Sequence, residues 1–165
     1  MQLDSKVVYL LLGSNLGDRR GLIDEAVIKI GEQIGTVVAR SANYETAAWG
    51  KEDQPSFLNV ALAVSTRLSA LAVLEEALAI EMELGRIRLE KWGARLIDID
   101  LILFGDEIID EGAKLQVPHP EMQHRKFVLE PLAEIAAGVF HPVLGQTVGE
   151  LLHSLTDNLT VSKIL

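Results

Sequence analysis

The spacing of apolar and polar residues along the chain predicts strands and helices in a fixed order. Continuous or alternating apolar runs predict strands, and apolar residues that recur every three to four positions predict helices. The predicted strands cover residues 7–12, 36–45, 57–66 and 98–104, and the predicted helices cover 16–34 and 70–84. The order strand–helix–strand–strand–helix–strand is typical of a ferredoxin-like α+β sandwich, with a mainly antiparallel sheet and helices packed on it.

Glycine, proline and capping residues predict where these elements stop. Gly35 ends the first helix, Ser69 caps the second, and Gly85 closes it. Pro131 predicts a break in the helical run 128–137. The run 147–150 is a capping box for a last helix through Leu155. Short strands are expected at 108–109 and 115–117. The apolar stripes of the two long helices are Leu22, Ile23, Ala26, Val27, Ile30 and Ile34, and Leu71, Leu74, Leu78 and Met82.

Length, charge and cysteine content narrow the classes of function. The chain has 165 residues, 48% of them hydrophobic, which fits one domain over 1–165 with a real core. A net charge of −9 argues against a nucleic-acid partner, which needs a basic surface. There is no apolar run of membrane-spanning length, no signal pattern and no cysteine. These features lead us to expect a cytoplasmic protein without a membrane partner. We also expect a monomer, although no feature of the sequence decides the oligomeric state.

The segment 85–107 carries the most chemistry. Asp98 and Asp100 alternate with Ile97, Ile99 and Leu101, so both carboxylates point to one face of a strand, roughly 6.6 Å apart. The continuation 101–104 is wholly apolar and predicts burial on both faces. Charge next to a buried strand needs a partner, and Mg²⁺ takes carboxylate oxygens together with substrate phosphates.

Basic residues precede this strand. Arg86, Arg88 and Arg95 lie just upstream of the two aspartates, and guanidinium groups suit phosphate oxygens. Trp92 lies in a charged, glycine-flanked stretch, which favours a lid over a core anchor. The combination favours metal-assisted chemistry on a nucleotide phosphate, and the alternative for the basic residues, judged on charge alone, is a solvated loop.

Other polar residues have two readings each. Asn59 in an apolar strand either satisfies the backbone or faces a ligand, and Phe57 on the same face is either core or a stacking platform. His119 between two prolines, with Arg125 after it, is either solvated or a phosphate contact. For Glu81, the residues alone favour a surface glutamate over one that orients an arginine.

Four stretches together give the chain a family resemblance. They are LLLGSNLGD, the run from ET to FLN at 45–59, KWGARLIDIDLILFGDE, and VPHPEM followed by FVLEPLAEIA. The chain resembles the 6-hydroxymethyl-7,8-dihydropterin pyrophosphokinases over nearly its whole length. The resemblance implies that ATP donates its β,γ-diphosphoryl group to the pterin hydroxymethyl oxygen, leaving AMP, in folate biosynthesis.

The resemblance also implies roles for single residues. Asp98 and Asp100 would bind two Mg²⁺ ions and would be catalytic together with Arg86 and Arg95. The ATP contacts would be Glu81, Arg86, Arg88, Trp92, Arg95, Leu101, Lys114, Gln116, His119 and Arg125. The pterin contacts would be Thr46, Ala47, Trp49, Phe57, Asn59, Trp92, Asp98 and Phe127. The matches of Arg88, Lys114 and Gln116 to the family pattern are the loosest.

Two other functions compete with this one. A metal-dependent nucleotide phosphohydrolase would use the same aspartates to activate water, but would not need Phe57, Asn59 and Phe127. A non-catalytic ligand-sensing domain would not need the aspartates and arginines to gather in one stretch. ATP turnover with and without the pterin separates the three.

Overall fold

A computed structural model describes residues 4–46, 56–87, 96–156 and 159–164, and among these the side chains of Arg86 and Ile87 are not described. The elements in chain order are β1 (Lys6–Ser14), α1 (Arg19–Gln33), β2 (Thr36–Arg40), β3 (Asn43–Thr46), β4 (Phe57–Thr66), α2 (Ala70–Ile87), β5 (Asp98–Phe104), β6 (Ile109–Asp110), β7 (Gln116–Val117), a 3₁₀ turn (Met122–His124), α3 (Lys126–Ala136), α4 (Val148–Ser154) and β8 (Val161–Ile164). The predicted α+β class is confirmed.

The main sheet has six strands, and every pairing in it is antiparallel. The strand order is β5-β1-β4-β3-β8, and β2 pairs with the second half of β4 beside β3. The strands β6 and β7 form a separate two-stranded sheet. β5, which carries the two aspartates, therefore lies at one end of the sheet order and β8 at the other.

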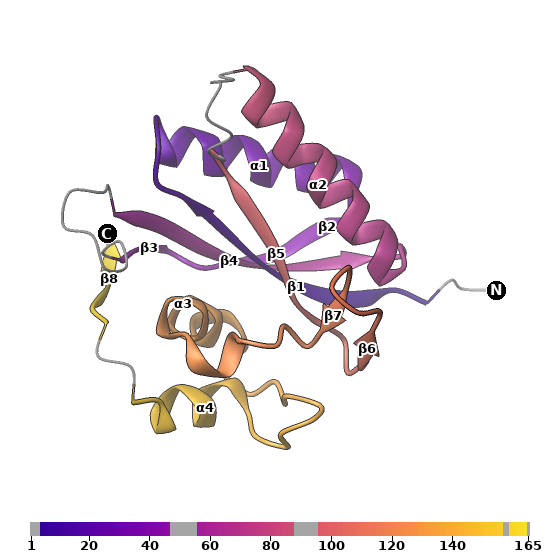
Figure 1. Cartoon of the computed structure of the whole chain (residues 1–165), viewed down its shortest axis with the longest axis vertical. Helices are drawn as coiled ribbons and strands as arrows, with labels where there is room; N and C mark the ends of the chain where they lie inside the picture. Colours follow the sequence, from indigo (N-terminus) through magenta and orange to yellow (C-terminus); the bar gives the residue numbers. More distant parts are fainter. Residues whose placement is uncertain (1–3, 47–55, 88–95, 157–158, 165) are drawn as a thin grey trace.

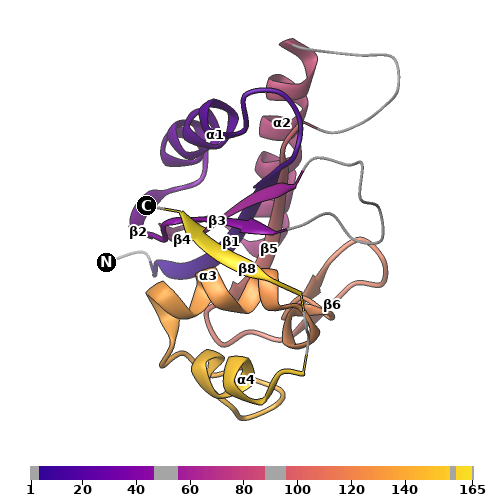
Figure 2. The same cartoon turned by 90° about the vertical axis from the view of Figure 1, so that its left-hand side faces the viewer.

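Helices cover both faces of this sheet. Figure 1 shows α1 and α2 on one face and α3 and α4 on the other, and Figure 2 shows the same layers from the side. A larger apolar cluster lies under α1 and α2, and a second lies under α3 and α4. β1 contributes to both, because Leu10 and Leu12 face the first cluster and Leu11 faces the second. No helix in the described part of the chain is long and apolar enough to cross a membrane.

The expected strand 36–45 is two strands, β2 and β3. The interruption falls at Ser41, which takes over part of the pairing with β4: its Oγ accepts a hydrogen bond from the Ala61 amide at 2.9 Å, and its own amide donates to the Ala61 carbonyl at 2.9 Å. The backbone groups of β4 thus stay satisfied across the break.

Two helix limits differ from the expectation. α1 begins at Arg19 instead of Leu16, because Gly17 has a positive φ of 66° and Asp18 is the N-cap, accepting from the Gly21 amide at 3.1 Å. α2 runs through Gly85 to Ile87, so Gly85 does not close it. A helical glycine costs only about 1 kcal/mol, which a packed helix can absorb.

The expected buried stripe of α2 was only partly right. Leu78 and Met82 are 46% and 59% exposed, whereas Val73, Ala77, Ile80 and Leu84 are buried. The buried face is thus offset from the predicted one: Leu71 and Leu74 only pack at its edge, and Leu78 and Met82 face solvent. The stripe of α1 is confirmed, with Leu22, Ile23, Ala26, Ile30 and Ile34 buried and Val27 packed against them.

Pro131 does not break α3. The helix is continuous over Lys126–Ala136 with the proline inside it. Proline removes one helical hydrogen bond, but Val128, Leu129 and Leu132 bury the helix against the second cluster, and tertiary packing supplies most helical stability. The predicted capping box of α4 is confirmed: Thr147 and Glu150 exchange hydrogen bonds of 2.8 and 3.1 Å.

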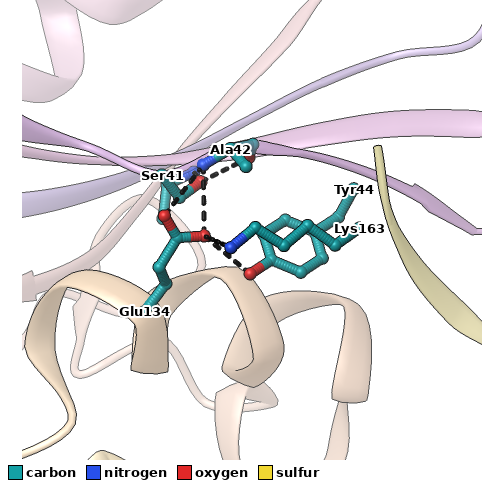
Figure 3. Close-up of polar contacts among 6 residues, drawn as sticks. Ser41, Ala42, Tyr44, Glu134 and Lys163 are labelled. Carbon is teal, nitrogen blue, oxygen red and sulfur yellow. Dashed lines mark hydrogen bonds and ion pairs between the residues drawn. The ribbon is translucent and has the colours of Figure 1, made fainter. Parts of the chain in front are cut away.

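α3 is tied to the sheet by Glu134. Its carboxylate accepts hydrogen bonds from the Tyr44 hydroxyl at 2.6 Å and from the Ala42 amide at 3.2 Å, and it faces the Lys163 ammonium of β8 at 3.9 Å (Figure 3). Burial and the bond to Glu134 raise the pKa of Tyr44, so its hydroxyl stays a donor at neutral pH. One carboxylate thereby links α3, β3 and β8.

Candidate active site

A cavity of about 690 Å³ gathers several of the polar residues singled out above. It collects side chains from β1, β3, β4, β5, the start of α3 and the chain that follows α4. Its lining residues are Leu11, Gly13, Thr46, Phe57, Asn59, Asp98, Asp100, His124, Arg125, Phe127, Leu155, Thr156 and Leu159. The sheet provides the polar floor, and the later segments provide walls.

A cross-strand row builds that floor. Gly13 on β1 lies opposite Asp98 on β5 and opposite Asn59 on β4. Residues directly opposite each other in antiparallel strands point to the same face, so Asp98 and Asn59 flank a position without a side chain. Two strand spacings of about 4.8 Å separate them. The row thus sets a carboxylate and an amide on either side of an open strip.

Gly13 is required for this arrangement. A Cβ at position 13 would lie 2.6 Å from Asn59 Nδ2, closer than real contacts allow. The same Nδ2 donates to the Leu12 carbonyl at 3.3 Å, which fixes the orientation of the amide. Any larger residue at position 13 would displace Asn59.

Buried polar atoms of two cavity residues on β3 and β4 have no hydrogen-bond partner among the described residues. They are Asn59 Oδ1 and Thr46 Oγ1, and their residues are each 4% exposed. Because Nδ2 of Asn59 is bound to the backbone, its Oδ1 is the atom left to accept. Buried polar groups are nearly always satisfied, so these two atoms point to a polar ligand.

The two aspartates lie as the alternation predicts. Asp100 is exposed and Asp98 is half-buried, both line the cavity, and Ile97, Ile99 and Leu101 are buried on the other face. Within the described residues, no three His, Cys, Asp or Glu side chains converge to hold a metal ion. A pair of carboxylates still fits Mg²⁺, which commonly takes one or two protein carboxylates and fills its shell with water and substrate phosphate.

Glu81 is buried, so the surface interpretation was wrong. Its side chain reaches from α2 to the backbone of β5, and Oε2 accepts a hydrogen bond from the Ile99 amide at 2.6 Å. Ile99 lies between the two aspartates on a strand at the end of the sheet order, where backbone donors need partners from outside the sheet. Glu81 thus positions the strand that carries them.

His119 and Arg125 lie beside the aspartates. The pKa of His119 is lowered by burial, raised in part by the Asp100 carboxylate, and lowered further by the Arg125 guanidinium. Its Nδ1 accepts from the Glu121 amide at 3.1 Å, so the neutral ring carries its proton on Nε2. This leaves Nε2–H as a donor for a ligand oxygen.

Aromatic rings and a tied pair of strand ends complete the site. Phe57 and Phe127 line the cavity, and the Arg125 guanidinium carbon lies 5.7 Å from the Phe127 ring centre. Arg19 donates to Glu45 Oε2 at 3.0 Å and to the Ser56 carbonyl at 3.0 Å, which joins the end of β3 to the start of β4. These contacts fix the strand ends that present Thr46 and Phe57.

The family model of the 7,8-dihydro-6-hydroxymethylpterin-pyrophosphokinases matches residues 9–137, which include every strand of the polar floor. The chain belongs to this family. It is 46% identical over 149 residues to the 2-amino-4-hydroxy-6-hydroxymethyldihydropteridine pyrophosphokinase of Methylorubrum extorquens, covering 89% of this chain and 92% of the relative. It is 44% identical over 136 residues to the Bacillus subtilis protein of the same name, covering 82% of this chain and 81% of the relative.

Solved structures show the same fold. A Plasmodium falciparum HPPK-DHPS triple mutant matches with a TM-score of 0.73 at 18% identity, covering 92% of this chain. The chain spans 43% of that longer protein. The likeness at this identity concerns the fold alone.

The cavity brings together only part of the residue set that the family resemblance implies. Thr46, Phe57, Asn59, Asp98, Asp100, Arg125 and Phe127 line it, and His119 is their neighbour. Leu101 is buried in the cluster under α1 and α2, while Lys114 and Gln116 are exposed and do not line the cavity. Ala47, Trp49, Arg88, Trp92 and Arg95 lie outside the described residues, and the same holds for the side chain of Arg86. The lid prediction for Trp92 falls there too.

Sequence reasoning missed several lining residues. Gly13 and Leu11 could have been found from the register of β1 against β5, since both are opposite an aspartate. His124 precedes Arg125 but has no pattern of its own. Leu155, Thr156 and Leu159 follow α4, and no local signal ties them to residues near position 46.

Proposed function

We propose that this chain transfers the β,γ-diphosphoryl group of ATP to the hydroxymethyl oxygen of 6-hydroxymethyl-7,8-dihydropterin, giving AMP and the pterin diphosphate. The observation that carries the proposal is the row Asp98–Gly13–Asn59, which sets a carboxylate and an unsatisfied amide oxygen on the floor of one cavity. Family membership supports the reaction, and the row supports a site with two adjoining halves, in which the phosphates would lie on the β5 side and the ring on the β4 side.

The ring half is supported by its buried polar atoms and its aromatic rings. The amide oxygen of Asn59 and the hydroxyl of Thr46 are buried and would pair with the polar edge of a pterin. Phe57 and Phe127 line the same cavity and would pack on the flat ring. Ala47 and Trp49 belong to this half as proposed contacts.

The phosphate half is supported by charge. Asp98 and Asp100 would hold two Mg²⁺ ions, and these ions would neutralise negative charge on the β- and γ-phosphates. Arg125 lines the cavity and His119 offers Nε2–H, which supports the proposal that both orient phosphate oxygens. Arg86 and Arg95 are proposed to steer the transferred group, and Glu81, Arg88, Trp92, Leu101, Lys114 and Gln116 to lie on the nucleotide side.

In the proposed reaction, no side chain of the protein forms or breaks a covalent bond. The hydroxymethyl oxygen forms a bond to the β-phosphorus, the bond from that phosphorus to the α,β-bridging oxygen breaks, AMP leaves, and the hydroxyl proton passes to solvent. Positioning and fixed charges therefore carry most of the catalysis. The enclosed floor between Asp98 and Asn59 suits this, because both substrates would be held against one rigid sheet.

Nucleotide analysis tests the proposal. Purified protein is incubated with Mg²⁺ and ATP, with and without the dihydropterin, and the nucleotides are separated. AMP that forms only with the pterin supports the proposal. ADP or pterin-independent AMP indicates a phosphohydrolase, and no turnover indicates a binding domain. That the enzyme is a single domain acting as a cytoplasmic monomer stays a prediction.

A further inference from the structure

The chain after α4 forms part of the cavity wall. Leu155, Thr156 and Leu159 line the cavity together with Phe57 and Phe127. The family model ends at residue 137, so it assigns these three residues no role. They come from the last part of the sequence, yet they share a cavity with residues of β1 and β4.

This wall is held at both ends. Before it, α4 carries the Thr147 capping box, and Val148 and Leu151 are buried in the second apolar cluster, against which Leu155 also packs. After it, β8 pairs with β3, and Val161 lies directly opposite the cavity residue Thr46. Leu155 therefore follows a docked helix and Leu159 precedes a paired strand, so each of these two side chains is held from one side.

Glu134 fixes the strand end of the wall more firmly. Its carboxylate accepts from Tyr44 of β3 at 2.6 Å and faces Lys163 of β8 at 3.9 Å, and these two residues are register partners (Figure 3). The ion pair with Lys163 is partly exposed and contributes little alone. Together with the backbone ladder, it holds β8 next to β3, and so Leu159 next to the rim at Thr46.

The chemistry of the wall indicates what it touches. Two leucines offer apolar surface and no charge, so they suit a flat ring better than phosphates. The polar groups of the ring half lie on the floor, at Asn59 and Thr46, and the aromatic residues Phe57 and Phe127 provide further walls. Binding sites for flat heterocycles are commonly apolar on their sides with a few polar groups that set orientation.

We infer that Leu155 and Leu159 form an apolar wall of the ring-binding half, so that the C-terminal segment takes part in recognition of the heterocyclic substrate. This inference rests on the proposed function. It makes the segment after α4 a determinant of ring affinity and of the ring size that fits, without a direct role at the phosphates.

Calorimetry on the full chain tests the inference. The dihydropterin is titrated in the presence of Mg²⁺ and a saturating non-hydrolysable ATP analogue, and the analogue is titrated alone. For Leu159→Ala we expect pterin affinity to fall on the order of tenfold, the range for removing methylene contacts from an apolar pocket, while analogue affinity stays within twofold. Leu159→Met, which conserves volume, restores most of the affinity.

Two further variants separate the wall from general damage to the fold. Leu144→Ala removes a leucine that is 43% exposed on the same C-terminal part and does not line the cavity, and it should change neither affinity. Leu155→Ala should weaken the pterin as Leu159→Ala does, with melting temperatures recorded for all variants because Leu155 also packs on the second cluster.

The outcomes are distinguishable. Unchanged pterin affinity in both Leu159→Ala and Leu155→Ala overturns the inference while leaving the proposed function standing. A loss confined to the ATP analogue also overturns it, since the wall would then belong to the nucleotide. If the wild-type protein binds no pterin under these conditions, the result contradicts both the proposed function and this inference.

Discussion

The carboxylate of Glu81 accepts a hydrogen bond from the backbone amide of Ile99 at 2.6 Å, and Ile99 is the residue between Asp98 and Asp100. A side chain of α2, on one face of the sheet, therefore holds the backbone of β5 in position. The other face of β5 carries both aspartates. The contact is buried, so solvent does not replace it when it is lost. We therefore propose that Glu81 is a positioning residue for the phosphate half.

Replacing Glu81 tests this relationship. Glu81→Ala leaves the Ile99 amide without its buried acceptor, which costs about 1–3 kcal/mol of stability, and it should weaken a Mg²⁺-ATP analogue while sparing the pterin. Glu81→Gln keeps an acceptor oxygen and should recover most of the stability. Urea unfolding and calorimetry measure both effects, with the exposed Glu75→Ala on the same helix as the control. Equal loss of both ligands in Glu81→Ala would contradict a role specific to β5.

Gly13→Ala should damage the ring half alone. The added Cβ would lie 2.6 Å from Asn59 Nδ2 and would push the amide away from the Leu12 carbonyl. We expect pterin affinity to fall by about 1–3 kcal/mol, as for a lost buried hydrogen bond, and analogue affinity to stay unchanged. Gly31→Ala is the matched control: a Cβ there meets nothing within 4 Å, and alanine in a helix should add about 0.5–1 kcal/mol of stability. An intact pterin site in Gly13→Ala would refute the cross-strand row.

Thr46→Val separates binding from stability. The Thr46 hydroxyl is buried and has no partner among the described residues, so replacing it with a methyl group of similar shape should leave the melting temperature equal or higher. If the hydroxyl pairs with the pterin, affinity should fall by about 0.5–1.5 kcal/mol. A lower melting temperature with full pterin affinity would mean that the hydroxyl serves the fold.

Asp98→Asn and Asp100→Asn should remove activity and keep the fold. Each carboxylate is proposed to hold Mg²⁺ at the transferred group, so turnover should fall on the order of 10²–10⁴. In chelator, the variants should melt no lower than wild type, because two like charges roughly 6.6 Å apart repel without metal. Asp106→Asn, in the exposed turn after β5, is the control. A clear drop in melting temperature in chelator would favour a structural role for the aspartates.

Local patterns predicted the parts of this site that depend on one strand. The alternation at 97–101 correctly placed both aspartates on one face, and Asn59, the amide singled out in the apolar strand 57–66, lines the same cavity while its role toward a ligand stays a prediction. The pattern could not predict the strand register, which places Gly13 of β1 opposite both Asp98 of β5 and Asn59 of β4. Registry depends on how whole strands pair, and it is not encoded in any short window.

The errors have a common physical origin in tertiary packing. Gly85 and Pro131 are poor helix formers, yet α2 and α3 continue through them because the buried faces of these helices outweigh the local cost. Glu81 was predicted to be a surface residue because charged side chains are seldom buried. The sequence does not show that the Ile99 amide of β5 donates a hydrogen bond to it. Leu159 reaches the cavity only through β8, a strand that we did not predict.

Phosphorus NMR of the complete reaction tests the central claim most directly. Wild-type protein, Mg²⁺, ATP and the dihydropterin are followed over time, with Asp100→Asn in a parallel sample. Transfer of the intact diphosphoryl group predicts that the ATP signals give way to AMP and to two mutually coupled signals of a diphosphate ester, in equal amounts, and that Asp100→Asn slows both together. Appearance of ADP, or of inorganic phosphate or pyrophosphate without the ester, would contradict the account.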